Sequence, residues 1–417
     1  MTLTLQPEAR TSQRGIRCPS KIVIVGAGMF GVVTAIALRA RGHSVSIIDP
    51  GPLPNPRAAS TDISKFVRMD YGADDLYTEL ADDALARWDT WNDEFGEVVY
   101  NETGLTVMGR QPMEPGSFEF ESFARLEKRG IAAERLDSLG LSARFPVWSA
   151  AKYVDGYFNP RAGWAASGRV VALLLARARD AGIQVHEGVR FDHLIEEDAR
   201  IAGIGATDGT EYRADVVVVA AGAWTPSMLP QLRELVWVSA HPVFHFHVSD
   251  VPAFRPPRFS CWTADISQTG WYGFPALEDG TVKVANHGPG RTVDPDGPRQ
   301  LDDLAVERCR EFLRGSFPIL ARSPLVEARL CLYCDSWDGN FLIDHDPDRP
   351  GLVIATGDSG HAFKFAPVLG DVIADVVERV PNRFAERFRW RARGALASED
   401  ARFTGSDRSG RKLDQPY

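Results

Sequence analysis

The sequence of 417 residues contains few cysteines, no long apolar run and no excess of positive charge. Its five cysteines are odd in number and thinly spread, which argues against a disulfide scaffold and is typical of a reducing compartment. The longest apolar stretch, ADVVVVAAGAW, is far too short to span a bilayer. A net charge of −9 disfavours nucleic acid and anionic membranes as the main partner. We therefore expect a cytoplasmic protein that binds neither nucleic acid nor a membrane.

Targeting segments are missing as well. The first twenty residues are polar and lack the apolar core of a signal peptide, so we expect residues 1–19 to form a loose tail. The C-terminal letters KLDQPY match no retention or peroxisomal signal. Otherwise the composition is that of an ordinary soluble globular protein, with 25% charged residues. The chain is longer than one hydrophobic core supports, which predicts two domains.

One close pair of cysteines, Cys331 and Cys334 in RLCLYC, requires an interpretation. A structural zinc site needs four ligands, and Cys18, Cys261 and Cys309 form no second close pair. A redox dithiol normally lies at a helix start, whereas ARLCLYCDSWDG alternates like a strand, which would point the two thiols to opposite faces. The interpretation that remains is one working thiol with a bystander.

The most informative motif lies near the start, where an apolar strand at residues 22–25 runs into three spaced glycines. Gly26 permits the tight turn, Gly28 lets the backbone approach a pyrophosphate, and Gly31 lets the following helix pack closely on the strand. A second strand, SVSIID, ends in Asp49, whose carboxylate can bind ribose hydroxyls, while the helix N-terminus stabilises phosphate charge. This order predicts a dinucleotide-binding βαβ unit. The alternative is a plain βαβ unit with a tight turn.

The spacing of the later units distinguishes FAD from NAD. A simple NAD dehydrogenase would continue at once with further βα units, whereas here the next recognisable unit starts near residue 167. An interrupted nucleotide domain fits a flavoprotein, in which FAD lies extended through the fold. We expect further cofactor contacts from Val189, Gly222, Gly357 and Gly360, the last two just before the final helix.

The fold class follows from these units and from the segments between them. We predict a discontinuous α/β FAD-binding domain of Rossmann type and an α+β substrate domain with an antiparallel sheet. The stretch GWYGFPALEDGTVKVANHG alternates around a turn like a hairpin of that sheet. We assign the FAD-binding domain to 20–102, 158–232 and 335–390, the substrate domain to 103–157 and 233–334, and a C-terminal tail to 391–417.

At this point the chain resembles a known family. Its motifs VGAGMFG, STDISKFVRMDYG, VVVVAAGAW, GWYGFP, RLCLYC, NFLID and GDSGHAFKF are similar, in this order, to those of the FAD-dependent amine oxidases around monomeric sarcosine oxidase and the fructosyl-amino-acid oxidases. These enzymes form a branch of the D-amino-acid-oxidase superfamily. The resemblance covers about residues 20–390, and it is more specific for the fold and the flavin chemistry than for the substrate.

The resemblance gives Cys331 a role. Members of the family carry FAD joined covalently to a cysteine thiolate, and Cys331 occupies that place in RLCLYC. A thiolate can add to the activated methyl group of an electron-poor flavin ring. Cys334 lies at a position that the family does not require to be cysteine, so we interpret it as packing. The alternative is a buried structural Cys331 with dissociable FAD.

The resemblance also implies the residues that bind the substrate. Arg68 and Lys364 match the pair that holds the substrate carboxylate, for which a planar guanidinium and an ammonium are suited. Lys65 lies where relatives carry a second basic residue near the flavin, and here it is lysine rather than the arginine expected of sarcosine enzymes. Tyr71 and Tyr272 could line the pocket and meet an amine with their aromatic faces.

Two further residues are implied near the flavin. His361 precedes Lys364 by three and should lie beside the ring, and Lys283 matches the lysine that activates oxygen in the family. His287 is a weaker candidate. Substrate amines must lose a proton before oxidation, and the cationic neighbours favour the neutral amine, so no dedicated base is required.

These observations predict an amine oxidase with covalent FAD. It would oxidise a secondary amine with a carboxylate, such as an N-alkyl or N-glycated amino acid, to an imine, and reduce O2 to hydrogen peroxide. The family favours monomers. Alternatives are a D-amino-acid oxidase or amine dehydrogenase of the same fold with dissociable FAD, and a thiol-sensing flavoprotein that does not turn over substrate.

Overall fold

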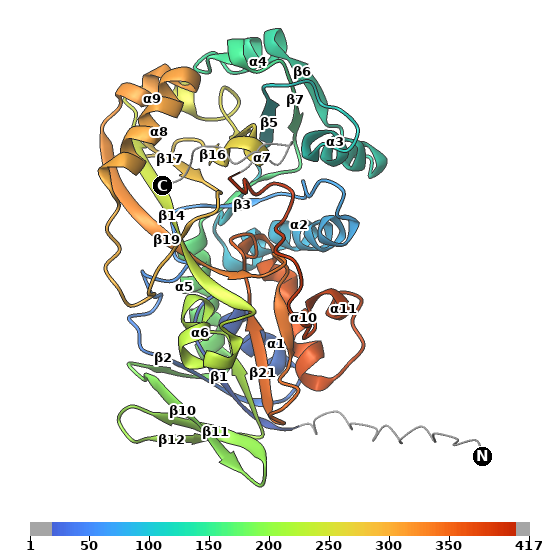
Figure 1. The fold of residues 1–417 in the computed structure, drawn as a ribbon, viewed down its shortest axis with the longest axis vertical. Coiled ribbons are helices and arrows are strands. Elements are labelled where there is room, and N and C mark those ends of the chain that lie inside the picture. Colours follow the sequence, from blue (N-terminus) through green and yellow to red (C-terminus); the bar gives the residue numbers. More distant parts are fainter. Residues whose placement is uncertain (1–18, 406–417) are drawn as a thin grey trace, which may run out of the picture.

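The computed structural model describes residues 19–405. The predicted N-terminal tail therefore lies outside the described residues except for Pro19. Two large sheets, one in each half of the elongated molecule, organise the chain (Figure 1).

The lower half in Figure 1 is built on a six-stranded sheet in which five neighbouring strands run parallel. Only the edge strand β20 is antiparallel to its neighbour. From edge to edge the strands are β20 (Leu342–His345), β21 (Leu352–Thr356), β13 (Val216–Val219), β1 (Lys21–Val25), β2 (Ser44–Asp49) and β9 (Gln184–Glu187). The central strands are continuous apolar runs because both faces of the sheet are covered.

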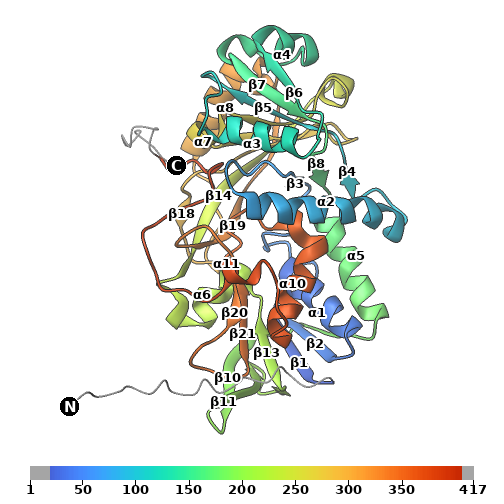
Figure 2. The same ribbon diagram turned by 90° about the vertical axis from the view of Figure 1, so that its right-hand side faces the viewer.

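The two faces of this sheet contact different layers. Ile22 and Ile24 belong to the core shared with helices, whereas Val23 and Val25 belong to the core shared with a small meander. The helices are α1 (Met29–Ala40), α5 (Ser167–Asp180) and α10 (Ala366–Glu378), which lie together beside the sheet in Figure 2. The meander consists of β10 (Phe191–Glu197), β11 (Arg200–Ala206) and β12 (Glu211–Arg213), and the short helix α6 (Thr225–Met228) comes later in the chain, after β13.

The turn between β1 and α1 depends on two of the three glycines of the motif. Gly26 has a φ of +108°, a conformation that residues with a side chain rarely adopt. A Cβ on Gly31 would lie 1.9 Å from the carbonyl oxygen of Gly26. The helix therefore approaches its strand as closely as the sequence motif predicts.

The upper half contains a nine-stranded sheet, and it is mostly antiparallel as expected. One neighbouring pair, β15 and β5, is parallel instead, because a long excursion of the chain separates the two strands and lets both enter from the same side. The strands are β18 (Arg291–Thr292), β14 (Val236–His247), β17 (Thr281–Asn286), β16 (Trp271–Gly273), β15 (Cys261–Ala264), β5 (Leu105–Gly109), β7 (Asp155–Asn159) and β6 (Glu134–Asp137), with β19 (Leu325–Ser336) paired to β14. The expected hairpin is present as β16 and β17.

Helices surround this upper sheet (Figures 1 and 2). They are α3 (Phe118–Lys128), α4 (Ser138–Arg144), α7 (Ile266–Thr269), α8 (Asp303–Ser316) and α9 (Pro318–Arg322). Asp302 caps the N-terminus of α8, and its side chain accepts a hydrogen bond from the N–H of Ala305. Helix α8 buries Cys309 and Leu313 in the upper core.

Two structures join the halves. The long ribbon of β14 and β19 reaches from the lower core, which contains Val236 and Cys334, to the upper core, which contains Phe244 and Phe246. Between the halves lie helix α2 (Asp75–Phe95) and a small sheet of β3 (Lys65–Val67), β8 (Gly163–Ala165) and β4 (Tyr100–Asn101). Residues on β3 and just after it therefore lie where the two halves meet.

The end of the described chain is not a loose extension. After the short helix α11 (Ala385–Phe388), residues 391–405, which we assigned to a C-terminal tail, run back along the molecule, and Ala401, Arg402 and Phe403 are buried. Residues 406–417 lie outside the described part. We propose to keep the predicted division into two domains and to count residues 391–405 with the junction between them.

Gly31→Ala should lower the free energy of unfolding by at least about 1–3 kcal/mol, because the new methyl group forces the helix away from the strand. Urea unfolding measures this as a lower midpoint. Gly28→Ala is the matched control, since the nearest atom to its Cβ would be the Ser60 hydroxyl at 3.6 Å and its φ is −73°. Its effect should stay within about 0.5 kcal/mol. Equal losses in both variants would contradict this account of the turn.

Candidate active site

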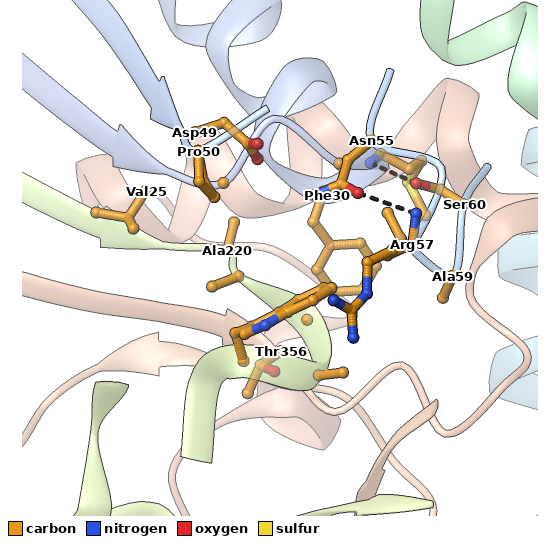
Figure 3. A pocket seen from close by; sticks show the side chains of 18 of the residues that line it. Val25, Phe30, Asp49, Pro50, Asn55, Arg57, Ala59, Ser60, Ala220 and Thr356 are labelled. Carbon is orange, nitrogen blue, oxygen red and sulfur yellow. Dashed lines mark hydrogen bonds between the residues drawn. The ribbon is translucent and has the colours of Figure 1, made fainter. Parts of the chain in front are cut away.

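A cavity of about 280 Å³ lies at the carboxyl ends of the parallel strands. Val25, Asp49, Ala220 and Thr356, which line it, end or follow β1, β2, β13 and β21 (Figure 3). In open parallel sheets this edge is where nucleotides bind. We call it the cofactor cavity.

Local hydrogen bonds fix the walls of the cofactor cavity. The Asp49 carboxylate accepts hydrogen bonds from the N–H groups of Ala27, at 2.9 Å, and Gly51, at 2.8 Å. Burial raises the pKa of Asp49, while these two N–H groups lower it. The loop opposite carries Ser60, whose hydroxyl lies 3.4 Å from the N–H of Met29 in the first turn of α1 (Figure 3).

The structure distributes the predicted cofactor residues over three places. Seven of them line the cofactor cavity: Gly26, Gly28, Asp49, Lys65, Val189, Gly222 and Gly360. His361 lines a neighbouring cavity. Gly31 packs against the backbone of β1, and Gly357 has a φ of +74° in the turn after β21. Cys331 lines neither cavity but lies beside Lys65, which lines both.

A second, smaller cavity of about 50 Å³ adjoins the cofactor cavity. Lys65, Tyr333, Gly360 and Phe363 line both cavities. We call this second space the inner cavity. Its other lining residues include Arg68, Tyr272, His361 and Lys364, which the sequence predicted for the substrate or the flavin.

Arg68 is buried and held from two sides. Its guanidinium donates to the carbonyl oxygen of Asp70 and lies over the ring of Tyr71, 4.9 Å from the ring centre. Its Nη2 lies 3.6 Å from Oε2 of Glu399. Burial works against the charge of Arg68, but the carboxylate of Glu399 and other neighbours raise its pKa above the usual value. The inner cavity thus contains a permanent cation.

Lys364, Tyr71 and His361 form a hydrogen-bonded chain. His361 Nε2 lies 3.0 Å from the carbonyl of Gly339, so Nε2 carries the proton and Nδ1 accepts from the Tyr71 hydroxyl at 3.1 Å. Lys364 donates to the Tyr71 oxygen at 2.8 Å and to the His361 carbonyl at 2.6 Å. Burial lowers the pKa of His361 to about 4, so its ring is neutral at pH 7. Burial also lowers the pKa of Lys364, and Arg68 lowers it further.

A second group of charges surrounds the buried carboxylate of Asp62. Lys283 donates to it at 2.6 Å and to the Ser64 carbonyl at 2.5 Å, and the ammonium of Lys65 lies 3.5 Å away. Burial would raise the pKa of Asp62, but Lys283 and Lys65 outweigh it and hold the pKa well below its usual range. Burial lowers the pKa of Lys283 to about 8, although Asp62 opposes this.

Lys283 therefore does not project into solvent from β17. It is 1% exposed and does not line the inner cavity, but its ammonium lies 4.8 Å from the ring centre of Phe274, which does. Lys65 links the Asp62 group to the cavities. Its ammonium contacts Asp62 and lies 3.6 Å from the sulfur of Cys331, and its side chain lines both the cofactor cavity and the inner cavity.

The two cysteines of RLCLYC lie in different surroundings. Cys331 belongs to a small cluster with Val243, Ala285 and Tyr333, whereas the sulfur of Cys334 lies 3.2 Å from the Thr356 hydroxyl. Both thiols are free. Burial raises the pKa of Cys334 to about 12, so this thiol stays protonated. Their position on opposite faces of β19 gives them no shared chemistry.

Comparison with known proteins identifies the family. A family model described as FAD dependent oxidoreductase matches residues 21–376. The chain belongs to this family. L-saccharopine oxidase of Schizosaccharomyces pombe is 29% identical over 399 residues, covering 85% of this chain and 88% of that protein. Monomeric sarcosine oxidase of a Bacillus species is 25% identical over 360 residues, covering 85% and 90%.

A solved structure agrees with these matches. The fructosamine oxidase Amadoriase II from Aspergillus fumigatus superposes with a TM-score of 0.79 at 25% identity and covers 94% of both chains. The predicted resemblance and fold class are thereby confirmed. Within residues 19–405 no helix has the length and apolar character needed to cross a membrane.

The residues around the cofactor cavity of this FAD-dependent oxidoreductase fit FAD. A Cβ on Gly28 would meet nothing closer than 3.6 Å, so the backbone there is open to a pyrophosphate. Within residues 19–405, the N–H of Met29 has only a long hydrogen bond, and it lies at the N-terminus of a helix of 12 residues, where phosphate is favoured. Asp49 lies at the end of β2, as required for a contact with ribose.

Sequence reasoning missed two acidic residues of this oxidoreductase. Asp62 was part of the motif STDISK, but its letters do not reveal that it faces two lysines. Glu399 lies in a stretch without helical or strand pattern, yet its side chain is 6% exposed and lines the inner cavity. No local signal points to it, because its contacts with Arg68 and His287 join segments that are more than 100 residues apart.

Proposed function

We propose that this oxidoreductase oxidises the carbon–nitrogen bond of a secondary amine that carries a carboxylate, such as an N-alkyl or N-glycated amino acid. The amine loses two electrons and two protons to become an imine, and oxygen gains them to become hydrogen peroxide. When bound, FAD accepts the electrons from the amine and delivers them to oxygen. Relatives named as sarcosine oxidase and N-methyl-L-tryptophan oxidase support a substrate of this class.

The observation that carries the proposal is the cation pair in the inner cavity. Arg68 and Lys364 line a space that shares four residues with the cofactor cavity, so an anion held by them has the rest of its molecule within reach of the flavin site. In the described part of the chain the ammonium of Lys364 makes two hydrogen bonds, which leaves one ammonium proton for a ligand. A carboxylate beside Lys364 would restore its charge, because an anion favours the ammonium form.

The substrate amine must be neutral when its bond is oxidised. The charges of Arg68, Lys65 and Lys283 disfavour a further positive charge nearby, which lowers the pKa of a bound amine. The neutral ring of His361 adds no charge. We therefore assign no dedicated base, and we assign His361 and Tyr71 to the positioning of Lys364.

We further propose that the flavin is tethered to Cys331. The ammonium of Lys65 lies 3.6 Å from the Cys331 sulfur, beside the atom that would bond to the flavin methyl carbon. In this step the thiol and the methyl group each lose a proton, and the two electrons released leave with O2. This contact supports the tether, while the cofactor itself follows from the family.

Two predictions from the sequence complete the proposal. We propose that the enzyme is a monomer, as the resemblance implies, and that it works in the cytoplasm, as the thinly spread cysteines indicate. The two thiols of RLCLYC are free, which fits a reducing compartment.

Acid precipitation tests the tether. The yellow colour should stay with the precipitated wild-type protein, and Cys331→Ala should release it into the supernatant. Cys334→Ala is the matched control, because its thiol lies three residues away and contacts Thr356 instead of Lys65. Colour that leaves the wild-type precipitate would show that FAD is dissociable.

Arg68→Ala should lower kcat/KM for the amino acid substrate about ten- to 150-fold, because a charge-assisted hydrogen bond contributes roughly 1.5–3 kcal/mol. The methyl ester of the same substrate has no carboxylate and should lose much less. Steady-state kinetics on the acid and the ester, with both enzymes, provide the comparison. Equal losses on the two substrates would remove Arg68 from the carboxylate site.

Lys283→Met should slow the reaction of the reduced enzyme with oxygen by two or more decades. Negative charge develops on oxygen during this step, and an ammonium about 4 Å away contributes on the order of 4 kcal/mol at an effective dielectric of 20. Anaerobic reduction by the amine should stay within about tenfold of wild type. Rapid mixing of pre-reduced enzyme with oxygen measures the affected step alone.

The same charge predicts a pH dependence. The ammonium of Lys283 is present below a pKa of about 8 and is lost above it, so the wild-type oxygen reaction should slow as the pH rises through 8.

A double variant serves as the control for Lys283→Met. The single substitution removes the ammonium and also leaves the buried Asp62 carboxylate without its main partner. Asp62→Asn, Lys283→Met removes the carboxylate as well and thereby separates these two causes of a slower oxygen reaction. If the double variant reacts with oxygen at the wild-type rate, the cause is an unpaired Asp62 and not a missing lysine.

A further inference from the structure

The inner cavity is too small for a whole substrate of the proposed class. Its volume of about 50 Å³ accommodates roughly four water molecules. That is enough for a carboxylate and the carbon and nitrogen next to it, but not for a further side chain or sugar. The remainder of the substrate must extend into another space.

A third cavity of about 460 Å³ lies next to the inner cavity and shares Glu399 with it. We call it the outer cavity. Tyr71 also lines it, while the hydroxyl of Tyr71 reaches the Lys364–His361 chain of the inner cavity. The side chains of Glu399 and Tyr71 therefore form the partition between the two cavities. The volume of the outer cavity lies in the usual range for sites that bind small molecules.

The lining of the outer cavity is acidic. Besides Glu399, its charged lining residues are Asp74, Asp75, Asp338, Asp400 and Arg387. Arginines balance three of these carboxylates: Arg387 pairs with Asp74, Arg125 with Asp75 and Arg391 with Asp338. Among residues 19–405, Asp400 has no ion pair within 4.0 Å, and it is exposed. The cavity thus keeps an excess of negative charge.

The carboxylate of Glu399 independently indicates a ligand that donates a hydrogen bond. One oxygen of its carboxylate accepts from His287 Nε2 at 2.7 Å, whereas Oε2 has no hydrogen-bond partner in the described part of the chain and lies 3.6 Å from Arg68. A buried carboxylate oxygen without a hydrogen bond is costly. A donor on a ligand that passes the partition would remove this cost. The carboxylate of Glu399 also repels a substrate carboxylate on Arg68, which disfavours a ligand that brings only negative charge.

We infer that the substrate carries a second, positively charged group, and that Glu399 and the acidic outer cavity bind it while Arg68 and Lys364 hold the carboxylate. This inference rests on the proposed function and narrows its substrate class to N-alkyl derivatives of basic amino acids. Glu399 then determines substrate specificity, because neither a neutral substrate side chain nor a second substrate carboxylate can form a charge-assisted hydrogen bond with its carboxylate.

The test uses ligands that bind but cannot be oxidised to an imine. In the two probes a methylthio group replaces the N-methylamino group: 6-amino-2-(methylthio)hexanoate carries a terminal ammonium, and 2-(methylthio)hexanoate is the same chain without it. Binding to the FAD-loaded enzyme is measured by titration calorimetry and by the change in flavin absorbance. The wild type should bind the ammonium probe at least tenfold more tightly.

The variants assign this preference to its residues. Glu399→Gln should reduce the preference about tenfold or more, since a charge-assisted contact is lost, and it should bind the neutral-chain probe as well as or better than wild type. Asp400→Asn, which is exposed, should reduce the preference about threefold. Asp82→Asn is the control, because Asp82 lies on α2 outside the cavity and pairs with Arg129. It should leave the preference unchanged.

Three results would overturn the inference: no preference in the wild type, an unchanged preference in Glu399→Gln and Asp400→Asn, or no binding of either probe. The wild-type comparison alone decides the matter if a variant fails to fold. Failure of the proposed oxidase function has a different signature. In that case the thioether probes still show the preference, but no α-N-methyl amino acid, including α-N-methyl-lysine, bleaches the flavin under anaerobic conditions.

Discussion

The carboxylate of Asp62 is the interaction on which the arrangement of the site depends. It is completely buried, and it receives the ammonium of Lys283 from the upper sheet and that of Lys65 from the small sheet between the halves. The backbone carbonyl oxygen of Asp62 accepts hydrogen bonds from the Ser167 hydroxyl and the Gly168 N–H at the start of α5. One residue thus joins three parts of the chain at the place where the cavities meet.

The physical effect of Asp62 is to make two buried lysines tolerable. An unpaired ammonium in an apolar interior is costly, and it loses its proton unless a carboxylate compensates it. The pKa of Lys283 stays near 8 in spite of complete burial because Asp62 opposes the effect of desolvation. The pair therefore keeps a titratable charge beside the inner cavity, and Lys65 adds a cation next to Cys331.

At the inner cavity, too, a buried carboxylate compensates a buried cation. Arg68 faces Glu399, and the hydrogen bond from His287 together with the charge of Arg68 lowers the pKa of Glu399 despite the burial of its carboxylate. The carboxylates of Asp62 and Glu399, which are far apart in the sequence, thus set the charge beside Lys65 and Lys283 and in the inner cavity. They come from segments that belong to no regular element, so their placement depends on how the two halves of the molecule and residues 391–405 pack around the site.

Much of the fold and part of the site were predictable from local pattern. The glycine spacing required a tight turn and a close helix, and Gly26 and Gly31 show the φ angle and the contact that cause this requirement. The alternation around Cys331 and Cys334 put them on opposite faces of a strand, because successive side chains of a strand alternate. The resemblance of motifs, rather than local pattern, pointed to Arg68, His361 and Lys364, and these three residues line one cavity.

Only the tertiary structure decided which charges face each other. The sequence determined that Lys283 lies on a strand, but its partner Asp62 lies 221 residues earlier and no period connects the two. The same holds for Glu399, which the sequence placed in a tail and the fold places against Arg68 and His287. Local propensity and hydrophobic period determine elements and their buried faces, because these depend on neighbours along the chain. Ion pairs between distant segments depend on how the two halves of the molecule pack together, and that is a property of the folded chain alone.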